Sequence, residues 1–316
     1  MEHVGIAGAG LVGRLMAWRL LREGCRVTLF DKNDRHSWDN AGLTAAAMLA
    51  PYSEVVRGER IVFDLGQDSL ARWPRWLAEL EADTGMAVFY RREGSLIVAH
   101  PRDEADLRRF ERHLHHAVTP GPDEVRRVDE SELGRLEPQL AGRFPHGLFI
   151  RDEGQLANDQ LFEALERALD RLGCEWQDGV EVTRVEPHRL VTAEGTRAFD
   201  RVVDARGLGL REQDQRLRGV RGEVLWVEAP EVSLNRPVRL MHPRYQLYIA
   251  PRPGNLYIIG ATEIESDDLG PMTVRSGLEL MSALYSVHPG FGEGRVVRTQ
   301  VHCRPAYMDN LPRIEL

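Results

Sequence analysis

The chain has 316 residues, enough for about two domains that each bury a sizeable core. It carries 49 acidic and 41 basic side chains, and the net charge of −8 argues against a nucleic-acid-binding surface. Three widely spaced cysteines without a CxxC pair indicate a reducing compartment, for which the cytoplasm is the simplest interpretation.

The first 31 residues predict a strand, a glycine-rich turn, a helix and a second strand. Gly8 allows the tight turn, Gly10 lets the backbone approach a pyrophosphate, and Gly13 lets the helix pack closely on the strand. The helix N-terminus offers free N–H groups to phosphates. Asp31 ends the second strand, where a carboxylate can accept the hydroxyls of an adenosine ribose. The segment therefore predicts a dinucleotide site, with a glycine-rich turn that binds no nucleotide as the alternative.

The same segment bears on membrane insertion. Its apolar stretch 4–21 is interrupted by four glycines and Arg14, and the first strand begins too early to leave room for a leader. We expect neither a signal peptide nor a membrane span.

The next elements alternate between helices and short strands. Residues 41–51 predict one short helix of small residues closed by Pro51, against which something flat can lie, or which packs on another helix. Helical spacing predicts a helix over 60–82 with a tryptophan-rich core face, and two strands meet at a turn around 93–94. A helix predicted over 103–117 carries three histidines. Because this helix is charged, we favour a solvated helix face over a metal site for them.

The second half of the chain is rich in strands. A helix over 158–172 precedes short strands at 180–182 and 201–204, and the latter runs into glycines that can reach the same nucleotide crevice. Four strands within 219–261 predict a mostly antiparallel sheet, followed by a helix over 272–285 and a strand over 294–303.

These elements predict an α/β protein with a Rossmann-like dinucleotide-binding domain and a second, α+β domain built on the antiparallel sheet. We expect the first domain to comprise residues 1–85, 146–218 and 300–316, and the second to comprise 86–145 and 219–299.

Several motifs resemble the flavin-dependent amine oxidases of the glycine oxidase, D-amino acid oxidase and sarcosine oxidase group, and most of all the glycine oxidases associated with thiamine biosynthesis. The resemblance covers nearly the whole chain. Besides the opening fingerprint, it is carried by residues 44–51, 204–207, 220–224, 247–252, 260–263 and 303–312.

The resemblance implies non-covalent FAD and a set of residues that hold it. The expected cofactor residues are Gly8, Gly10, Leu11, Val12, Gly13, Asp31, Lys32, Thr44, Ala46, Ala47, Met48, Val180, Ala205 and Gly207. Of these, Thr44, Ala46, Ala47 and Met48 would lie along the flavin, and Val180 near the adenine. Arg304 and Tyr248 would grip the substrate carboxylate as catalytic residues, and no metal is expected. A guanidinium suits this task because it can donate two parallel hydrogen bonds to a carboxylate.

Three positions leave the resemblance incomplete. Glu263 stands where the family has an apolar pocket residue, and its carboxylate could meet a substrate amine, repel the substrate acid or turn toward Arg252. Cys303 lies where sarcosine oxidases attach flavin covalently, but here a buried small residue is expected. Relatives continue beyond Pro312 with a turn that covers the flavin, so either the given sequence is part of a longer chain or this protein holds FAD less fully.

The expected activity is oxidation of the Cα–N bond of a small amino acid such as glycine, with molecular oxygen as acceptor and hydrogen peroxide as product. The alternatives are a D-amino acid or secondary-amine dehydrogenase with another acceptor, a non-catalytic flavin-binding protein and a nicotinamide dehydrogenase. A homo-oligomer is possible.

Overall fold

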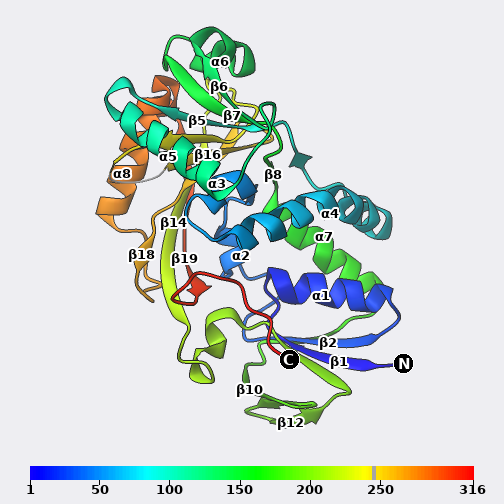
Figure 1. Cartoon of the computed structure of the whole chain (residues 1–316). Helices are drawn as coiled ribbons and strands as arrows, with labels where there is room; N and C mark the ends of the chain where they lie inside the picture. The colour runs from blue at the N-terminus through cyan, green and yellow to red at the C-terminus, as the bar shows by residue number, and fades with distance from the viewer. Residues whose placement is uncertain (244–246) are drawn as a thin grey trace.

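Two sheets of different size dominate the computed structural model, which describes residues 1–243 and 247–316 (Figure 1). A small parallel sheet with its helices occupies one end, and a large sheet occupies the other. The long strands β14 (Arg218–Glu228) and β19 (Arg295–Ala306) run between the two ends. The expected α/β fold with a second, mostly antiparallel sheet is confirmed.

The small sheet has the strand order β13-β1-β2-β9, and all its strands are parallel. Its members are β1 (His3–Ala7), β2 (Arg26–Asp31), β9 (Glu175–Asp178) and β13 (Arg201–Asp204). Helix α1 (Leu11–Arg22) connects β1 to β2, as the sequence predicts. The near-continuous apolar runs of β1 and β2 are buried, which is typical of parallel strands covered on both faces.

Helices α4 (Arg60–Thr84) and α7 (Asn158–Arg171) pack with α1 beside this sheet. The predicted tryptophan core of α4 is present, since Trp73 and Trp76 stack edge to face with ring centroids 6.0 Å apart. Trp18 of α1 meets Trp76 in the same way and donates its indole N–H to Asp83 over 2.8 Å. These contacts fix the position of α1, which carries the glycine-rich turn at its start.

The large sheet has the strand order β18-β14-β17-β16-β15-β5-β7-β6, and β19 pairs with β14. All its pairings are antiparallel except that between β15 and β5. The remaining strands are β5 (Ser95–Ala99), β6 (Val125–Asp129), β7 (His146–Ile150), β15 (Val238–Met241), β16 (Leu247–Arg252), β17 (Leu256–Gly260) and β18 (Ile264–Glu265). The strand that the sequence predicts over 246–250 includes Gln246, which lies outside the described residues.

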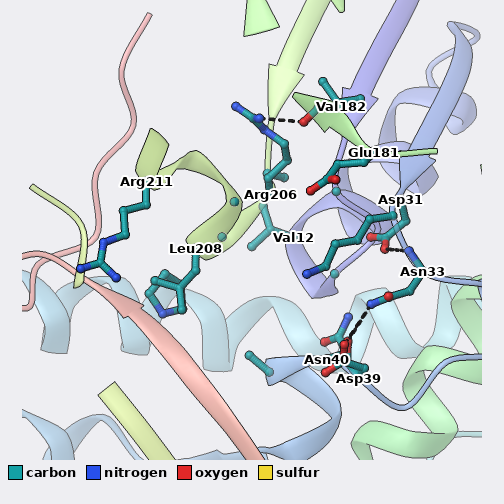
Figure 2. A pocket seen from close by; sticks show the side chains of 18 of the residues that line it. Val12, Asp31, Asn33, Asp39, Asn40, Glu181, Val182, Arg206, Leu208 and Arg211 are labelled. Carbon is teal, nitrogen blue, oxygen red and sulfur yellow. Dashed lines mark hydrogen bonds between the residues drawn. The ribbon is translucent and has the colours of Figure 1, made fainter. Parts of the chain in front are cut away.

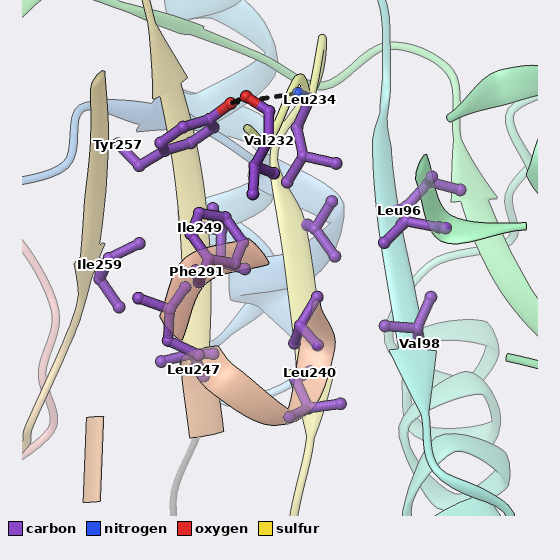
Figure 3. Close-up of a cluster of buried hydrophobic side chains, with 14 of the residues drawn as sticks. Leu96, Val98, Val232, Leu234, Leu240, Leu247, Ile249, Tyr257, Ile259 and Phe291 are labelled. Atoms are coloured by element: carbon purple, nitrogen blue, oxygen red, sulfur yellow. Dashed lines mark hydrogen bonds between the residues drawn. The ribbon is translucent and has the colours of Figure 1, made fainter. Parts of the chain in front are cut away.

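Helix α8 (Val274–Val287) contributes to the apolar core on one face of this sheet (Figure 3). Leu96, Ile249 and Ile259 are fully buried there. Tyr257 brings a hydroxyl into the same core, where it donates to the carbonyl of Val232 over 2.5 Å. The core therefore fixes β16, the strand that carries the candidate substrate-binding residue Tyr248.

Smaller elements complete the chain. A three-stranded antiparallel sheet follows α7 in the chain. A second three-stranded sheet and several short helices make up the rest. They are α2 (Ala41–Thr44), β3 (Met48–Leu49), α3 (Pro51–Val55), β4 (Tyr90–Arg91), α5 (Glu104–Ala117), α6 (Glu130–Leu136), β8 (Gly154–Leu156), β10 (Val182–Glu186), β11 (Arg189–Thr192) and β12 (Gly195–Ala198), with 3-10 turns at Pro101–Asp103, Pro138–Leu140, Gly207–Glu212 and Pro289–Glu293.

Two sequence predictions differ from the structure. Residues 41–51 do not form one helix: α2 ends at Thr44, Ala47 adopts a left-handed conformation with φ of 48°, and Pro51 begins α3. Proline suits this first helical position because its missing N–H has no partner to lose there. The strand expected at 180–182 begins only at Val182.

The division into two domains stays a prediction. Strand β7 lies in the large sheet, and β19 pairs with β14 from Arg295 to Ala306. Residues assigned to the nucleotide domain, 146–150 and 300–306, thus contribute strands to the larger sheet. No helix in the described ranges is long and apolar enough to cross a membrane.

Candidate active site

A cavity of about 990 Å³ opens at the carboxyl ends of β1, β2 and β13 (Figure 2). This edge of a parallel sheet is where doubly wound folds bind ligands. Most of the cofactor residues expected from the sequence line it, namely Gly8, Gly10, Leu11, Val12, Asp31, Lys32, Val180, Ala205 and Gly207.

The glycines of the opening turn have separate structural reasons. Gly8 has a φ of 98°, and a Cβ there would lie 2.4 Å from the carbonyl oxygen of Ala205. A Cβ at Gly13 would lie 1.8 Å from the carbonyl oxygen of Gly8, so only glycine lets α1 approach the turn. A Cβ at Gly10 would come no closer than 3.7 Å to its nearest neighbour, Asn40. Gly13 therefore allows α1 to pack closely on the turn, while Gly10 leaves space on the side of the turn that faces the cavity.

The N-terminus of α1 faces this cavity. Its N-cap residue, Gly10, has no side chain that could cap the free N–H groups, and the first turn contains no acidic residue. The positive end of the helix is thus not neutralised from within the helix, which suits the phosphates of a dinucleotide.

The Asp31 carboxylate ties the two sides of the site together. One oxygen accepts from the N–H of Ala9 over 2.6 Å. The other accepts from the N–H of Asn33 over 2.9 Å, as Figure 2 shows. Each carboxylate oxygen can accept a further hydrogen bond, so contact with a ribose hydroxyl is compatible with both.

Sequence reasoning missed Arg206, which lines the cavity at the turn after β13. Its guanidinium pairs with Asp204 at 2.6 Å and donates to the carbonyls of Val182 and Thr183 over 2.8 and 3.0 Å. These bonds join the turn after β13 to the start of β10, where Val182 and Thr183 also line the cavity. The sequence signal for this arginine is the placement of an acidic and a basic residue, Asp204 and Arg206, at the end of a predicted strand.

The expected flavin-side residues do not line this cavity but continue from its edge at Ala41 and Gly42. Ala46 and Met48 pack in an apolar cluster with Tyr248 and Ala261. Thr44 is buried, and its hydroxyl donates to the carbonyl of Asn40, as a helical side chain does, so it has little freedom to contact a ligand.

Tyr248 and Arg304 lie on different strands of the large sheet, and glycines make room for both. Tyr248 is paired with Gly260, where a Cβ would lie 2.8 Å from the tyrosine hydroxyl. A Cβ at Gly222 would lie 2.8 Å from Nη2 of Arg304, so the guanidinium rests directly on this backbone. Burial raises the pKa of Tyr248 and the charge of Arg304 opposes that shift, so the phenol is a neutral donor at physiological pH.

Arg304 has spare hydrogen-bonding capacity. It is exposed, and its Nη1 donates to the carbonyl of Thr262 over a long 3.5 Å. Within residues 1–243 and 247–316 it makes no ion pair. The surface ion pair that would be the ordinary role of such an arginine is thus not found there.

Glu263 and Cys303, whose roles the sequence leaves open, have clear partners in the structure. Glu263 pairs with Arg57 at 2.8 Å and does not turn toward Arg252, which corrects that alternative. The Cys303 thiol is buried beside the carbonyls of Ser266 and Asp268, and burial raises its pKa. A thiol held in its neutral form is a poor nucleophile for attachment to flavin. The three histidines of α5 are exposed, and the described part of the chain contains no cluster suited to a metal ion.

Comparison with known proteins decides the family. Residues 3–316 match the family model of FAD-dependent oxidoreductases. The chain belongs to this family. The oxidoreductase is 43% identical over 309 residues to a Rhizobium etli protein named as a thiamine biosynthesis oxidoreductase, ThiO, with 98% of this chain and 86% of that protein covered.

A second relative is the glycine oxidase of Geobacillus kaustophilus, 27% identical over 321 residues, with 98% of this chain and 82% of that protein covered. The crystal structure of glycine oxidase from the same organism superimposes with a TM-score of 0.85 at 26% identity, covering 99% of this chain and 85% of that one. The enzyme is thus similar to glycine oxidases in sequence and in fold.

The cavity fits the FAD that the family requires. It extends from Asp31 and Val180, past the uncapped start of α1, to Ala41 and Gly42. Its volume of about 990 Å³ is of the size that ligand and cofactor clefts have. The open side of Gly10 leaves space for a pyrophosphate.

Proposed function

We propose that this oxidoreductase oxidises the Cα–N bond of a small amino acid such as glycine and uses molecular oxygen as the electron acceptor. The observation that carries the proposal is the pair formed by Arg304, with spare donors, and the neutral Tyr248 hydroxyl beside the apolar Ala46–Met48 segment. The similarity to glycine oxidases and to ThiO supports the substrate and a role in thiamine biosynthesis.

In this proposal the cofactor residues are those expected from the sequence. Gly8, Gly10, Leu11, Val12 and the turn at Ala205 and Gly207 hold the pyrophosphate, while Asp31, Lys32 and Val180 hold the adenosine. Residues 44–48 flank the flavin. Gly13 contributes by setting the approach of α1. FAD is bound without a covalent bond, which the buried, neutral Cys303 thiol supports.

The protein's own contribution is to bind and orient the substrate. Arg304 donates to the substrate carboxylate with two N–H groups, and the Tyr248 hydroxyl donates a further hydrogen bond. Bound FAD supplies a two-electron acceptor. The apolar cluster around Ala46, Met48 and Ala261 favours an uncharged amine over an ammonium at the reacting end. Loss of two electrons and two protons gives the imine, water converts it to the oxoacid and ammonia, and oxygen takes up the electrons as hydrogen peroxide.

The proposed location is the cytoplasm, which the three free cysteines support. Assembly into a homo-oligomer stays a prediction.

A panel of amines tests the function on purified protein confirmed to contain FAD. Peroxide release under air is measured with glycine, N-methylglycine, D-alanine and ethylamine. We expect the highest kcat/KM for glycine and the lowest for ethylamine, which has no carboxylate. Anaerobic reduction of an artificial acceptor by the same amines separates an oxidase from a dehydrogenase. Flavin that none of these amines reduces would overturn the proposal.

A further inference from the structure

Arg252, at the end of β16, is a buried arginine that no part of the proposed catalysis uses. Its side chain donates to the carbonyl of Ala46 over 2.6 Å and to Oε1 of Gln155 over 3.0 Å. Burial lowers the pKa of Arg252 to about 10, so the guanidinium is still charged at physiological pH. Over the described ranges it makes no ion pair. Burying a charge without a carboxylate is unfavourable for stability alone, and an apolar side chain of similar volume commonly serves as well.

Asn158, at the start of α7, binds the same turn from a second direction. Its side-chain amide donates to the carbonyls of Gly42, Leu43 and Ala45 over 2.8, 2.9 and 2.7 Å. Carbonyls along residues 42–46 are therefore held by two side chains, one from each end of the molecule. Neither side chain is close to this turn in sequence.

The conformation of the turn explains why it needs such support. Ala47 has a φ of 48°, in the left-handed region that favours glycine. Its carbonyl accepts from the N–H of Leu156 over 3.2 Å, and the preceding carbonyl is the one that Arg252 binds. A non-glycine residue persists in this region only where its surroundings fix it, and such residues are common at ligand sites.

We propose that Arg252 is a positioning residue for FAD: it fixes the Ala46–Ala47 turn in the shape against which the flavin end of the cofactor lies. The turn starts at Gly42, which lines the FAD cavity, and ends at Met48, which packs against the same apolar cluster as Tyr248. It therefore connects the two halves of the site. The inference rests on the proposed place of the flavin, but it does not depend on which amine is oxidised.

The affinity of the apoprotein for FAD tests this role through quenching of FAD fluorescence. Arg252→Met should raise the Kd of FAD roughly tenfold, because the hydrogen bond from a charged donor to the Ala46 carbonyl is lost. Arg252→Lys should have a smaller effect, since an ammonium can still donate to one carbonyl. Arg236→Met is the matched control: Arg236 is also mostly buried, bonds the carbonyl of Leu136 and pairs with Glu137 at 3.7 Å, but it has no bond to the Ala46–Ala47 turn.

The Ala47→Gly substitution separates positioning of the turn from general stability. Glycine adopts the left-handed conformation without strain, so Arg252→Met should raise the Kd of FAD much less in the Ala47→Gly background than in the wild type. Additive effects of the two substitutions would overturn the proposal, as would an unchanged Kd in folded Arg252→Met. Should Arg252→Met not fold, the same cycle with Arg252→Lys decides between these outcomes. Failure of the amine panel with normal FAD binding would refute only the proposed function.

Discussion

Removal of the Arg304 guanidinium should weaken carboxylate binding far more than it slows the chemical step. A charge-assisted hydrogen bond contributes about 1.5–3 kcal/mol, so Arg304→Met should raise KM for glycine by about 10–150-fold. Tyr248→Phe removes one hydroxyl donor and should raise KM by roughly tenfold. Arg304→Lys keeps the charge but loses the paired geometry, and should fall between wild type and Arg304→Met.

Binding of glycolate measures this effect without turnover. Glycolate has the carboxylate of glycine but no amine, and its Kd can be followed by the change it causes in the absorption of bound FAD. Arg304→Met should raise this Kd by the same factor as KM. Arg295→Met is the matched control, because Arg295 is an exposed arginine at the far end of the same strand. An unchanged Kd for glycolate in Arg304→Met would refute the assignment of the carboxylate site.

The backbone under Arg304 offers an independent perturbation. A methyl group at Gly222 would lie 2.8 Å from Nη2 and 2.9 Å from Cζ of Arg304, which is too close for the guanidinium to remain in place. Gly222→Ala should therefore weaken glycolate binding although the charge is retained. A normal Kd in this variant would mean that carboxylate binding does not need the observed position of the guanidinium.

Three further predictions concern the cofactor turn, a buried acid and an exposed ion pair. Gly13→Ala should abolish stable FAD binding, measured as FAD retained in gel filtration, because its methyl would lie 1.8 Å from the carbonyl oxygen of Gly8. Burial raises the pKa of Glu153, so the folded protein keeps this proton at pH values where the unfolded chain has lost it. The free energy of unfolding should thus fall as pH rises from the ordinary carboxyl range through the folded-state pKa, and Glu153→Gln should remove that part of the slope in urea titrations. Glu263→Gln should change Tm little and KM for glycine less than about threefold, because exposed ion pairs such as that with Arg57 contribute about 0–1 kcal/mol.

Each of these outcomes has a direct contradiction. Retention of FAD by Gly13→Ala would mean that α1 can move away from the turn at no cost to the site. An unchanged pH slope in Glu153→Gln would show that the buried carboxyl is ionised in both states. A rise in KM of more than tenfold in Glu263→Gln would place this carboxylate on the substrate.

The parts of the site that the sequence predicts are those built from neighbouring residues. The strand, turn and helix from His3 to Arg22 are specified by apolar runs and by glycines whose roles depend on contacts within the same unit. The 41–51 segment could not be predicted in the same way. Its small residues suit a helix, but carbonyl contacts from α7 and β16, more than a hundred residues away in sequence, hold it in another shape.

Arg252 and Arg304 show why sequence alone could not assign the charges of the site. Both are arginines of the large sheet, and neither forms an ion pair with the described residues. Arg252 is 6% exposed, and its Nη1 and Nη2 atoms donate to Gln155, Pro251 and Ala46, so its terminal donors are used within the protein. Arg304 is exposed and has one long bond of 3.5 Å, so its donors are available to a ligand. If this distinction is right, Arg252→Met will weaken binding of FAD, and Arg304→Met will weaken binding of glycolate while leaving the affinity for FAD nearly unchanged.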